Sequence, residues 1–407
     1  MKWLADYYSA HGVGVSRSDI TLGAPRAENV HGADLVVYSA AVPPTDPERS
    51  EAARLGIKQI SRAEALASVM ACFGESIAVA GTHGKTTTVC MLGEMLSAYD
   101  PAVCFGGTCG GRRGKASGEI IVAEACEYMR GMLFMCPTIA VVLNAELDHT
   151  DCYAGEREVR DAFSEFVSRA EIAVAPDTLI PCMPKRYAVT VGRTGEYACI
   201  DSRVSADGMT IAVKTPDGVK RFRMRVPGAH NAENAVFAIA AARAFGADWS
   251  EIAGGLERFR GADRRLQRVG SMNGVPVFSD YAHHPTELAA SLAAYRAMGY
   301  KKPLVVFQPH THERLGAFFD EFAEVLSTCD SIVLPVFRAR GADEGRSSAD
   351  LAAVVRERGG RSEALGFEEA ADRIKNAAPV FGVIAVTGAG DNERLLPFLL
   401  DQSSPNE

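Results

Sequence analysis

The sequence predicts an α/β fold, and three observations support this prediction. Short runs rich in β-branched residues alternate with Ala- and Leu-rich helical stretches along most of the chain. These runs are continuously apolar, as expected for parallel strands that are buried on both faces. The alternation of strands with helices favours parallel sheets joined by crossover helices. The predicted strands include DLVVYSA, SIAVAG, EIIVAE, TIAVVLN, PLVVFQ, SIVLPVF and GVIAVTG.

Length and composition narrow the class of protein. The 407 residues suffice for two or three domains, and the net charge of −8 argues against nucleic acid as a partner. No apolar run reaches transmembrane length and the start lacks a signal-peptide core, so we expect a cytoplasmic protein without membrane insertion. None of the ten cysteines forms a C-x-x-C pair, so we expect reduced thiols and no structural zinc.

The composition changes at three places along the chain. Breaks near 71–75 (ACFGE) and near 260–275, which begins RGADRRLQRVGSMNG, indicate domain boundaries. Between 185 and 226, Asp-Gly turn signals separate short alternating runs, which predicts an antiparallel meander inserted in the middle domain. Three arginines of this segment alternate with apolar residues, and we expect them on a solvated strand face. They are Arg221, Arg223 and Arg225.

The stretch VAGTHGKTTT (79–88) lies between a predicted strand and a predicted helix. Its glycines would let backbone N–H groups face an anion at the helix N-terminus. Lys85 would reach the outer phosphates of a nucleotide, and the Thr86 hydroxyl would ligate Mg²⁺. Only two residues separate Gly81 from Gly84, where the general phosphate loop has four. A structural turn is the alternative interpretation.

Candidate metal-binding side chains follow two later predicted strands. Glu124 ends one strand, and His149 lies just beyond another. Because the carboxyl ends of parallel strands meet at one edge of a sheet, both residues can converge on Lys85. A glutamate after a strand can also be a solvated or capping residue, and a histidine is an unusual partner for Mg²⁺, which prefers oxygen. Asn144, Glu146 and Asp148 lie in the same segment as His149.

Together these segments resemble the Mur ligase family, ATP-dependent amide-forming enzymes of peptidoglycan synthesis, and in particular its alanine-adding branch. The short loop G-T-H-G-K-T-T is that family's form, and seven of the nine histidines fall in the matching motifs. The resemblance covers nearly the whole chain. Its motifs are HGADLVVYSAAVPPTDPERSEAARLGI (31–57), PGAHNAENAVFAIAAA (227–242), FRGADRRLQ (259–267), SDYAHHPTEL (279–288), FQPHTHERL (307–315) and VTGAGD (386–391).

The resemblance implies three α/β domains. Residues 1–72 would form a truncated Rossmann-like N-terminal domain that binds the UDP sugar. Residues 73–262 would form a central P-loop mononucleotide-binding ATPase domain with ligase function. Residues 263–407 would form a Rossmann-like C-terminal ligase domain.

The resemblance also implies a role for each matching residue. Catalysis would involve Lys85, Glu124, His149, Arg265 and His283. ATP would be bound by Gly81, Thr82, His83, Gly84, Lys85, Thr86, Thr87, His230, Asn234, Arg265 and Asp280, with His230 and Asn234 at the adenine and Asp280 at the ribose. Thr86, Glu124 and His149 would hold Mg²⁺. His283, His310 and Arg314 would line the muramoyl and alanine side.

The implied activity is ATP-dependent joining of L-alanine to UDP-N-acetylmuramate through an acyl phosphate, by a monomer or a homodimer. One alternative is a ligase that attaches a recycled peptide to the same nucleotide. Another is a non-catalytic nucleotide-binding relative, and a further one is a plain P-loop ATPase that hydrolyses ATP without alanine.

Several positions depart from the family pattern. Thr311 and His312 stand where arginine and tyrosine are usual, and Cys126 stands where aspartate is common. The family opens with a strand and a G-x-G-G-x-G-M loop. This chain matches only the family segment after that loop, with a predicted helix in KWLADYYSAHG and a strand-like GVGVSRSD. If Met1 is the true start, we expect normal ATP binding but at least about tenfold weaker binding of UDP-N-acetylmuramate than in a version extended upstream.

Overall fold

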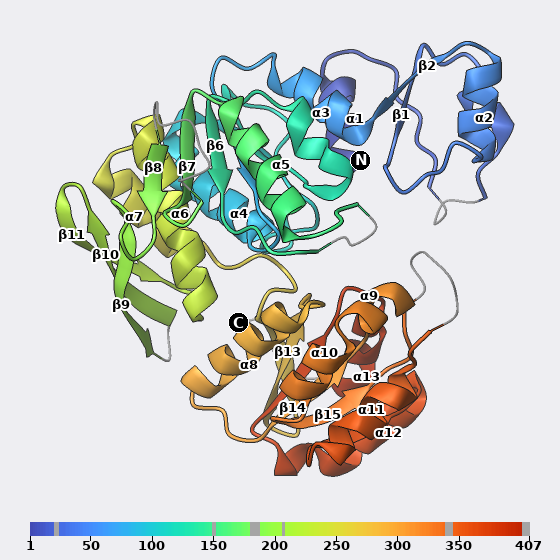
Figure 1. Cartoon of the computed structure of the whole chain (residues 1–407), viewed down its shortest axis with the longest axis vertical. Coiled ribbons are helices and arrows are strands. Elements are labelled where there is room, and N and C mark those ends of the chain that lie inside the picture. Colours follow the sequence, from blue (N-terminus) through green and yellow to red (C-terminus); the bar gives the residue numbers. More distant parts are fainter. Residues whose placement is uncertain (20–23, 149–151, 180–187, 206–207, 338–344, 401–407) are drawn as a thin grey trace. The chain divides into compact units, whose positions relative to one another are not determined.

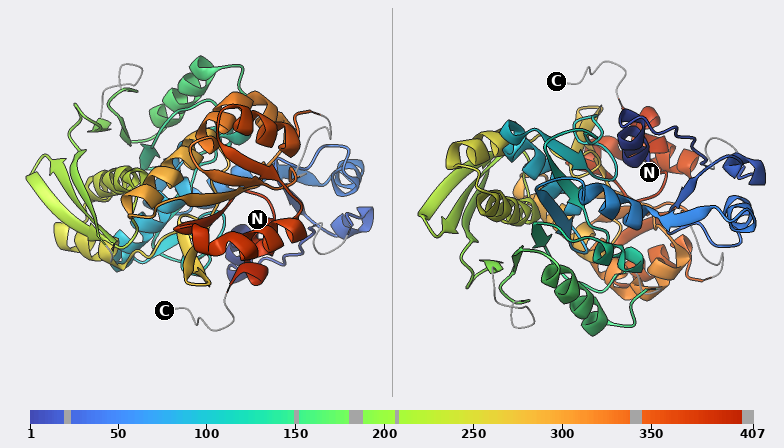
Figure 2. Two further views of the ribbon diagram at one scale, coloured as in Figure 1. Left: turned by 90° about the horizontal axis from the view of Figure 1, so that it is seen from below. Right: turned by 90° about the horizontal axis from the view of Figure 1, so that it is seen from above.

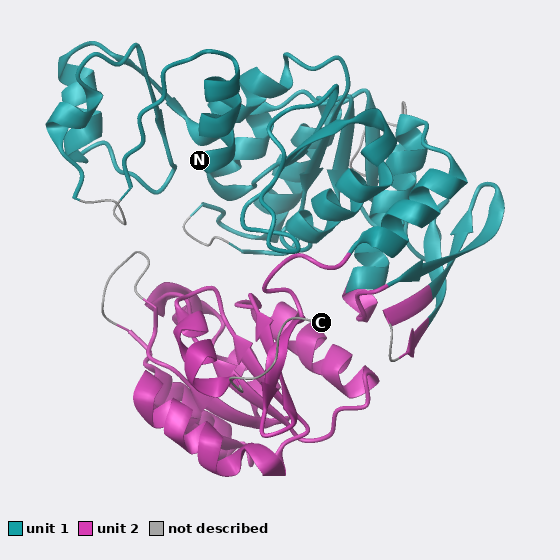
Figure 3. Cartoon of the chain, turned by 180° about the vertical axis from the view of Figure 1, so that it is seen from behind, with its two compact units in different colours: residues 1–202, 211–224, 231–259 teal, residues 203–210, 225–230, 260–407 magenta. Residues whose placement is uncertain are grey.

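The computed structural model describes residues 1–19, 24–148, 152–179, 188–205, 208–337 and 345–400. The chain divides into two compact units (Figure 3). The second unit takes up the chain from residue 260, close to the predicted boundary, whereas 1–72 belong to the same unit as the central sheet. The three-domain division therefore stays a prediction. The first unit comprises 1–202, 211–224 and 231–259, and the second comprises 203–210, 225–230 and 260–407.

A six-stranded parallel sheet forms the centre of the first unit, which confirms the predicted α/β fold. The strand order is β4-β5-β3-β6-β7-β8, so β3 pairs with β5 on one side and with β6 on the other. All residues of β3 and β6 are buried, as their continuous apolarity predicts. The strands are β3 (Ser76–Ala80), β4 (Pro101–Cys104), β5 (Ile120–Glu124), β6 (Ile139–Val142), β7 (Ile172–Pro176) and β8 (Ala188–Val191).

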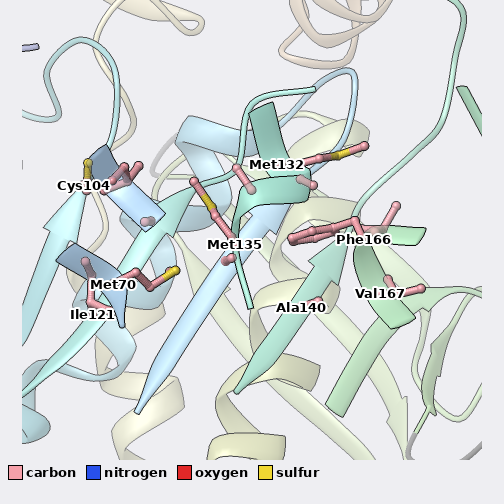
Figure 4. Packing of buried hydrophobic residues seen from close by; sticks show 14 of the residues in the cluster. Met70, Cys104, Ile121, Met132, Met135, Ala140, Phe166 and Val167 are labelled. Carbon is pink, nitrogen blue, oxygen red and sulfur yellow. The ribbon is translucent and has the colours of Figure 1, made fainter. Parts of the chain in front are cut away.

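Small residues on one face of this sheet make room for bulky side chains of the helices. Ala78 and Ala80 of β3 belong to a hydrophobic cluster that also contains the fully buried Phe163 and Phe166. Figure 4 shows Phe166 in this cluster together with methionines of neighbouring segments. Burying one such aromatic side chain stabilises the fold by roughly 1.5–3 kcal/mol. The helices on this face are α1 (Lys2–Ala10), α3 (Arg62–Met70), the 3₁₀ segment η3 (Tyr128–Phe134) and α5 (Glu156–Ser168).

The N-terminal segment combines a confirmed helix with a strand prediction that is wrong. Helix α1 forms as predicted and buries Trp3 and Tyr7, and the Trp3 indole N–H donates to the Lys115 carbonyl at 2.9 Å. The strand-like 12–19 has no strand and is exposed, so its valines lack a buried face to occupy. A two-stranded parallel sheet follows, with an intervening helix capped by Asp46. These elements are β1 (Leu35–Tyr38), α2 (Pro47–Arg54) and β2 (Lys58–Ser61).

The middle of the chain forms the predicted small sheet, with strand order β11-β10-β9 (Figures 1 and 2). Only two residues connect β10 to β11, a length that joins antiparallel strands. The turn predicted at Asp207 lies outside the described residues. Arg221 and Arg223 of β11 are exposed while Phe222 is buried, which confirms the solvated strand face for these two arginines. Arg225 is also exposed but lies one residue beyond the strand. The strands are β9 (Ala198–Ser205), β10 (Gly208–Thr215) and β11 (Gly218–Met224).

The helices on the other side of the central sheet pack closely. Helix α7 lies against both α4 and β11, and it begins at an Asp248–Glu251 capping box. A Cβ on Gly255 would lie 2.3 Å from the Met95 Cα, so only glycine permits this approach of α7 to α4. The helices are α4 (Lys85–Met95), α6 (Ala229–Phe245) and α7 (Trp249–Arg258).

The second unit holds another six-stranded sheet, of order β12-β13-β17-β14-β15-β16. Only β12 runs antiparallel, and an Asn273-Gly274 turn with positive φ at both residues joins it to β13. The strands are β12 (Gln267–Met272), β13 (Val275–Asp280), β14 (Pro303–Phe307), β15 (Asp330–Val333), β16 (Arg361–Ala364) and β17 (Val383–Thr387).

Helices cover both faces of this second sheet (Figure 1). Val306 and Ile384 face one hydrophobic cluster with α12 and α13, and Val305 and Phe307 face another with α8, α10 and α11. The helices are α8 (Pro285–Ala297), α9 (His312–Ala317), α10 (Phe319–Leu326), α11 (Ser348–Glu357), α12 (Phe367–Ala377) and α13 (Leu396–Leu399).

Two expectations from composition can be compared with the described residues. The nine cysteines among them are all free, in agreement with the expected reduced thiols. Among the described helices, none is both long and apolar enough to cross a lipid bilayer.

We predict that Gly255→Ala destabilises the first unit by about 1–3 kcal/mol, since the new methyl group collides with the α4 backbone. Urea denaturation followed by tryptophan fluorescence measures this, because both tryptophans, Trp3 and Trp249, lie in the first unit. Gly254→Ala is the matched control: its Cβ would meet only the flexible end of Arg258, so we expect a gain of about 0.5–1 kcal/mol from helix propensity. Equal effects of the two substitutions would contradict the packing described.

Candidate active site

Two glycines allow the conformation of the loop between β3 and α4. Gly81 and Gly84 have φ of 145° and 84°, and Gly84 is the N-cap of α4. A Cβ on Gly84 would lie 2.3 Å from Oδ1 of Asn234 on α6, and one on Gly81 would lie 3.0 Å from Cβ of Leu143. Glycine is therefore needed both for the backbone conformation and for the space. The first backbone N–H groups of α4 are left at the head of the helix, where an anion can bind.

Side chains and backbone after β6 fix this loop from one side. The backbone N–H of His83 donates to Oδ1 of Asn144 at 2.8 Å, and the Asn144 amide donates back to the His83 carbonyl at 3.2 Å. The Thr82 hydroxyl donates to the Glu146 carbonyl and accepts from the Glu146 N–H, at 2.9 and 3.0 Å. The loop is thus held in shape before any ligand binds, which lowers the entropy lost on binding.

Lys85 opens α4 and remains charged. Burial favours the neutral amine, but the carboxylates of Glu127 and Glu124 raise the pKa of Lys85 above its ordinary value. Its ammonium lies 2.8 Å from Oε2 of Glu127 and also donates to the carbonyls of Gly81 and Thr82. Glu127 was not identified from the sequence, because its contact with Lys85 joins residues that are distant in the chain.

Thr86 and Glu124 form an oxygen-rich pair beside the lysine. The Thr86 hydroxyl donates to Oε1 of Glu124, and the backbone N–H of Gly106 donates to Oε2 at 2.9 Å. Glu124 lies at the carboxyl end of β5, next to the loop that follows β3, as the sequence predicts. A hydroxyl and a carboxylate are hard oxygen donors of the kind that Mg²⁺ prefers, so these residues fit the predicted metal. The third predicted ligand, His149, lies outside the described residues.

The two predicted adenine contacts lie one turn apart on α6 but in different units. Asn234 is 8% exposed, and its amide packs against Gly84 of the loop. Thr87 is also buried, at the start of α4. His230 belongs to the second unit, where burial and the nearby Arg265 lower its pKa to about 4, so the ring is neutral.

In the second unit, polar residues gather after the neighbouring strands β13, β17 and β14. Asp280 ends β13 and is 2% exposed; its carboxylate accepts from the Ser291 hydroxyl and from the Ala282 N–H, and burial raises its pKa. The Gly388 N–H, after β17, donates to the Asp280 carbonyl at 3.0 Å. The Asp280 carboxylate is thus hydrogen-bonded to groups of its own unit, the Ser291 hydroxyl and the Ala282 N–H. Sequence reasoning did not foresee these contacts.

Histidines and arginines line the same end of the second sheet. The rings of His283 and His310 meet edge to face with centroids 5.9 Å apart, and the Arg314 guanidinium lies 3.1 Å from Nδ1 of His310. Burial lowers the pKa of His283 to about 4. Arg265 donates to the Glu287 carboxylate at 2.9 Å.

The residues that depart from the family pattern here have local partners. Thr311 is the N-cap of α9, where its hydroxyl accepts from the Arg314 N–H at 3.2 Å. The ring of His312 pairs with the Arg346 carbonyl at 3.1 Å. Burial raises the pKa of Cys126 to about 11, so its thiol is neutral where an aspartate would be charged.

Two family models match this chain. The Mur ligase middle domain matches residues 79–242, and the Mur ligase glutamate ligase domain matches residues 264–390. Among curated proteins, the UDP-N-acetylmuramate–L-alanine ligase of Agathobacter rectalis is 36% identical over 387 residues, which cover 90% of this chain and 84% of that protein.

Solved structures share the fold. The UDP-N-acetylmuramate–alanine ligase of Thermotoga maritima aligns with a TM-score of 0.78 at 24% identity and covers 96% of this chain and 90% of its own. The murein peptide ligase of Psychrobacter arcticus aligns with a TM-score of 0.68 at 21% identity, over 100% and 97% of the two chains. At these identities the likeness concerns the fold alone.

We predict that Gly84→Ala destabilises the first unit and that Asn234→Ala partly relieves the effect. The methyl group meets the Asn234 amide and forces a left-handed conformation on alanine, which itself costs about 1–2 kcal/mol. The double variant should therefore be more stable than the sum of the single changes implies. Urea denaturation with tryptophan fluorescence measures this, with Gly74→Ala as the control because nothing lies within 4 Å of its Cβ. Strict additivity would argue against the contact.

Proposed function

The chain belongs to the Mur ligase family, and we propose that it joins L-alanine to UDP-N-acetylmuramate at the expense of ATP, in peptidoglycan biosynthesis. The observation that carries the proposal is the charged Lys85 at the head of α4, beside Thr86 and Glu124. This is a site for the phosphates of a nucleotide. The choice of substrates is supported by the 36% sequence identity with the UDP-N-acetylmuramate–L-alanine ligase of Agathobacter rectalis, over 90% of this chain and 84% of that protein.

The proposed chemistry explains why the ligase needs ATP. A carboxylate oxygen is a poor leaving group, so an amine cannot displace it. Attack of the muramoyl carboxylate oxygen on the γ-phosphorus releases ADP and forms an acyl phosphate. The neutral amine of alanine then attacks the carbonyl carbon, the nitrogen loses a proton, inorganic phosphate leaves, and the amide remains.

Phosphoryl transfer between two anions requires positive charge around the moving group. We propose that Lys85 holds the outer phosphates, while the loop Gly81–Thr87 donates backbone N–H groups to them. Thr86 and Glu124 would hold Mg²⁺, with His149 as the further ligand, and the ion would supply additional positive charge next to the phosphates. The oxygen donors of the described pair support this assignment.

The roles of the remaining site residues are also part of the proposal. Asn234 and His230 would contact adenine, and Asp280 the ribose. Arg265 would reach phosphate. The neutral His283, with His310 and Arg314, would face the muramoyl and alanine groups, and the neutrality of both His230 and His283 favours contacts in which a ring nitrogen accepts a hydrogen bond.

The proposal also covers the setting in which the enzyme works. We propose a cytoplasmic enzyme without membrane insertion or a nucleic-acid partner, active as a monomer or homodimer. The proposal includes the three-domain organisation. Residues 1–72 would bind the UDP sugar, residues 73–262 would bind ATP, and residues 263–407 would close the site. The free cysteines among the described residues are compatible with a reducing compartment.

A substrate-dependence assay tests the function. The protein is incubated with ATP, Mg²⁺ and UDP-N-acetylmuramate, and ADP release is followed after addition of L-alanine or of a tripeptide. We expect release with alanine and formation of UDP-N-acetylmuramoyl-alanine in the mass spectrum. Release with the tripeptide alone would favour the recycling ligase, release without an amine a plain ATPase, and no release with any amine a non-catalytic relative.

We predict that Lys85→Ala lowers the rate of ligation by more than about a hundredfold while the fold persists. Removing a charge that acts on the transferring phosphoryl group raises the barrier by about 3–5 kcal/mol. Lys115→Ala is the control, since this exposed lysine of the same unit pairs with Asp100. The measurement is alanine-dependent ADP release together with the urea midpoint. A Lys85→Ala protein with turnover near that of Lys115→Ala would show that the phosphate loop is not where transfer occurs.

A further inference from the structure

We propose that Glu287 is a positioning residue that holds Arg265 and His283 at a fixed spacing with one carboxylate; this rests on the proposed function, in which both partners face the reacting groups. Glu287 lies in the first turn of α8 and does not itself reach a substrate in the proposal. Its role is exerted through its two partners, which come from segments on either side of the hairpin β12–β13.

The two oxygens of the carboxylate are divided between the two partners. Oε1 accepts from Nη1 of Arg265 at 2.9 Å. Oε2 accepts from the backbone N–H of His283 at 3.0 Å and from that of His284 at 3.4 Å, and it lies 3.3 Å from Nδ1 of His283. One rigid planar group therefore contacts the guanidinium on one side and both the backbone and the ring of the histidine on the other.

The same contacts determine which nitrogen of His283 carries the proton. Nδ1 faces two acceptors, the Tyr281 carbonyl at 2.9 Å and Oε2 of Glu287. Since neither group can donate, Nδ1 carries the hydrogen and the lone pair of the neutral ring is on Nε2. Nε2 is then the nitrogen that can accept a hydrogen bond from a substrate amine.

Burial makes the carboxylate necessary. The side chain of Glu287 is 9% exposed and that of Arg265 is 27% exposed, so water cannot fully replace either partner. The Tyr281 ring adds a cation–π contact, 5.3 Å from the Arg265 guanidinium. Truncating Glu287 would remove the carboxylate that Arg265 contacts directly and leave Asp280 as another acidic group that acts on it, so the guanidinium would move.

A second glutamate separates this role from simple helix capping. Glu369 occupies the same third helical position in α12, and its carboxylate accepts from the Gly366 backbone at 3.0 Å, as Glu287 does from His284 in α8. Both glutamates thus accept from the backbone N–H of their helix's N-cap residue, which is the N3 half of a capping box. Only Glu287 adds the arginine and the histidine. Glu369→Gln therefore removes the carboxylate charge at a helix N-terminus without affecting Arg265 or His283.

The experiment compares Glu287→Gln with Glu369→Gln in the alanine-dependent ADP assay. We expect Glu287→Gln to lower kcat at least about tenfold, with KM for ATP and alanine changed less than about threefold, because the misplaced groups act on the reaction step. Glu369→Gln should keep kcat within about twofold, with a similar small shift in melting temperature. A kcat of Glu287→Gln equal to that of Glu369→Gln would overturn the proposal.

A double-variant cycle tests whether Glu287 acts through Arg265. If it does, the losses caused by Glu287→Gln and Arg265→Ala should combine to less than their product, because the part that passes through Arg265 is already lost in Arg265→Ala. Losses that multiply in full would mean that the glutamate acts independently, and would overturn the proposal.

A crystal structure of Glu287→Ala provides a readout that does not depend on the reaction. Displacement of both the Arg265 guanidinium and the His283 ring supports the positioning role, and unchanged positions overturn it. If the unaltered protein releases no ADP with alanine, the proposed function fails, while this structure still decides the role of Glu287.

Discussion

The site in the first unit depends on the place of one strand. Because β3 lies between β5 and β6 in a parallel sheet, the loop that follows it emerges between the ends of two neighbours. One neighbour supplies Glu124, and the other supplies Asn144, whose amide holds the loop at His83. The hydrogen-bonding order of the strands thus determines which distant parts of the sequence meet. Local features, such as the two glycines, then adapt the loop to the space that remains.

The second unit applies the same arrangement with different chemistry. The ends of β13, β17 and β14 again lie side by side, and Gly388 after β17 donates to the backbone of Asp280 after β13. Here the strand ends carry a buried carboxylate and a group of histidines and arginines instead of an open glycine loop. The first unit therefore presents backbone donors and a charged lysine, whereas the second presents side chains whose protonation is controlled by burial.

The sequence predicted those features that have a local signal. Continuous apolarity predicted the buried strands, and the glycines predicted the loop between β3 and α4, because both patterns follow directly from backbone chemistry. The binding of phosphate by that loop stays a prediction. Glu127 and Glu287 escaped, since their roles depend on partners at a distance in three dimensions. The strand expected at 12–19 failed because valines alone do not provide a sheet to join. The role of His149 remains a prediction, as that residue lies outside the described chain.

In the proposed function, the pairing of Lys85 with Glu127 makes nucleotide binding an exchange of ion-pair partners. The ammonium already has a carboxylate and two carbonyls as partners, so an incoming phosphate gains only the difference between old and new contacts. Such an exchange lowers the affinity for the nucleotide. It also gives the Lys85 ammonium a carboxylate partner again when the product leaves. On this proposal the site needs no counter-ion from solution between turnovers, because Glu127 can pair with Lys85 again once the phosphate has left.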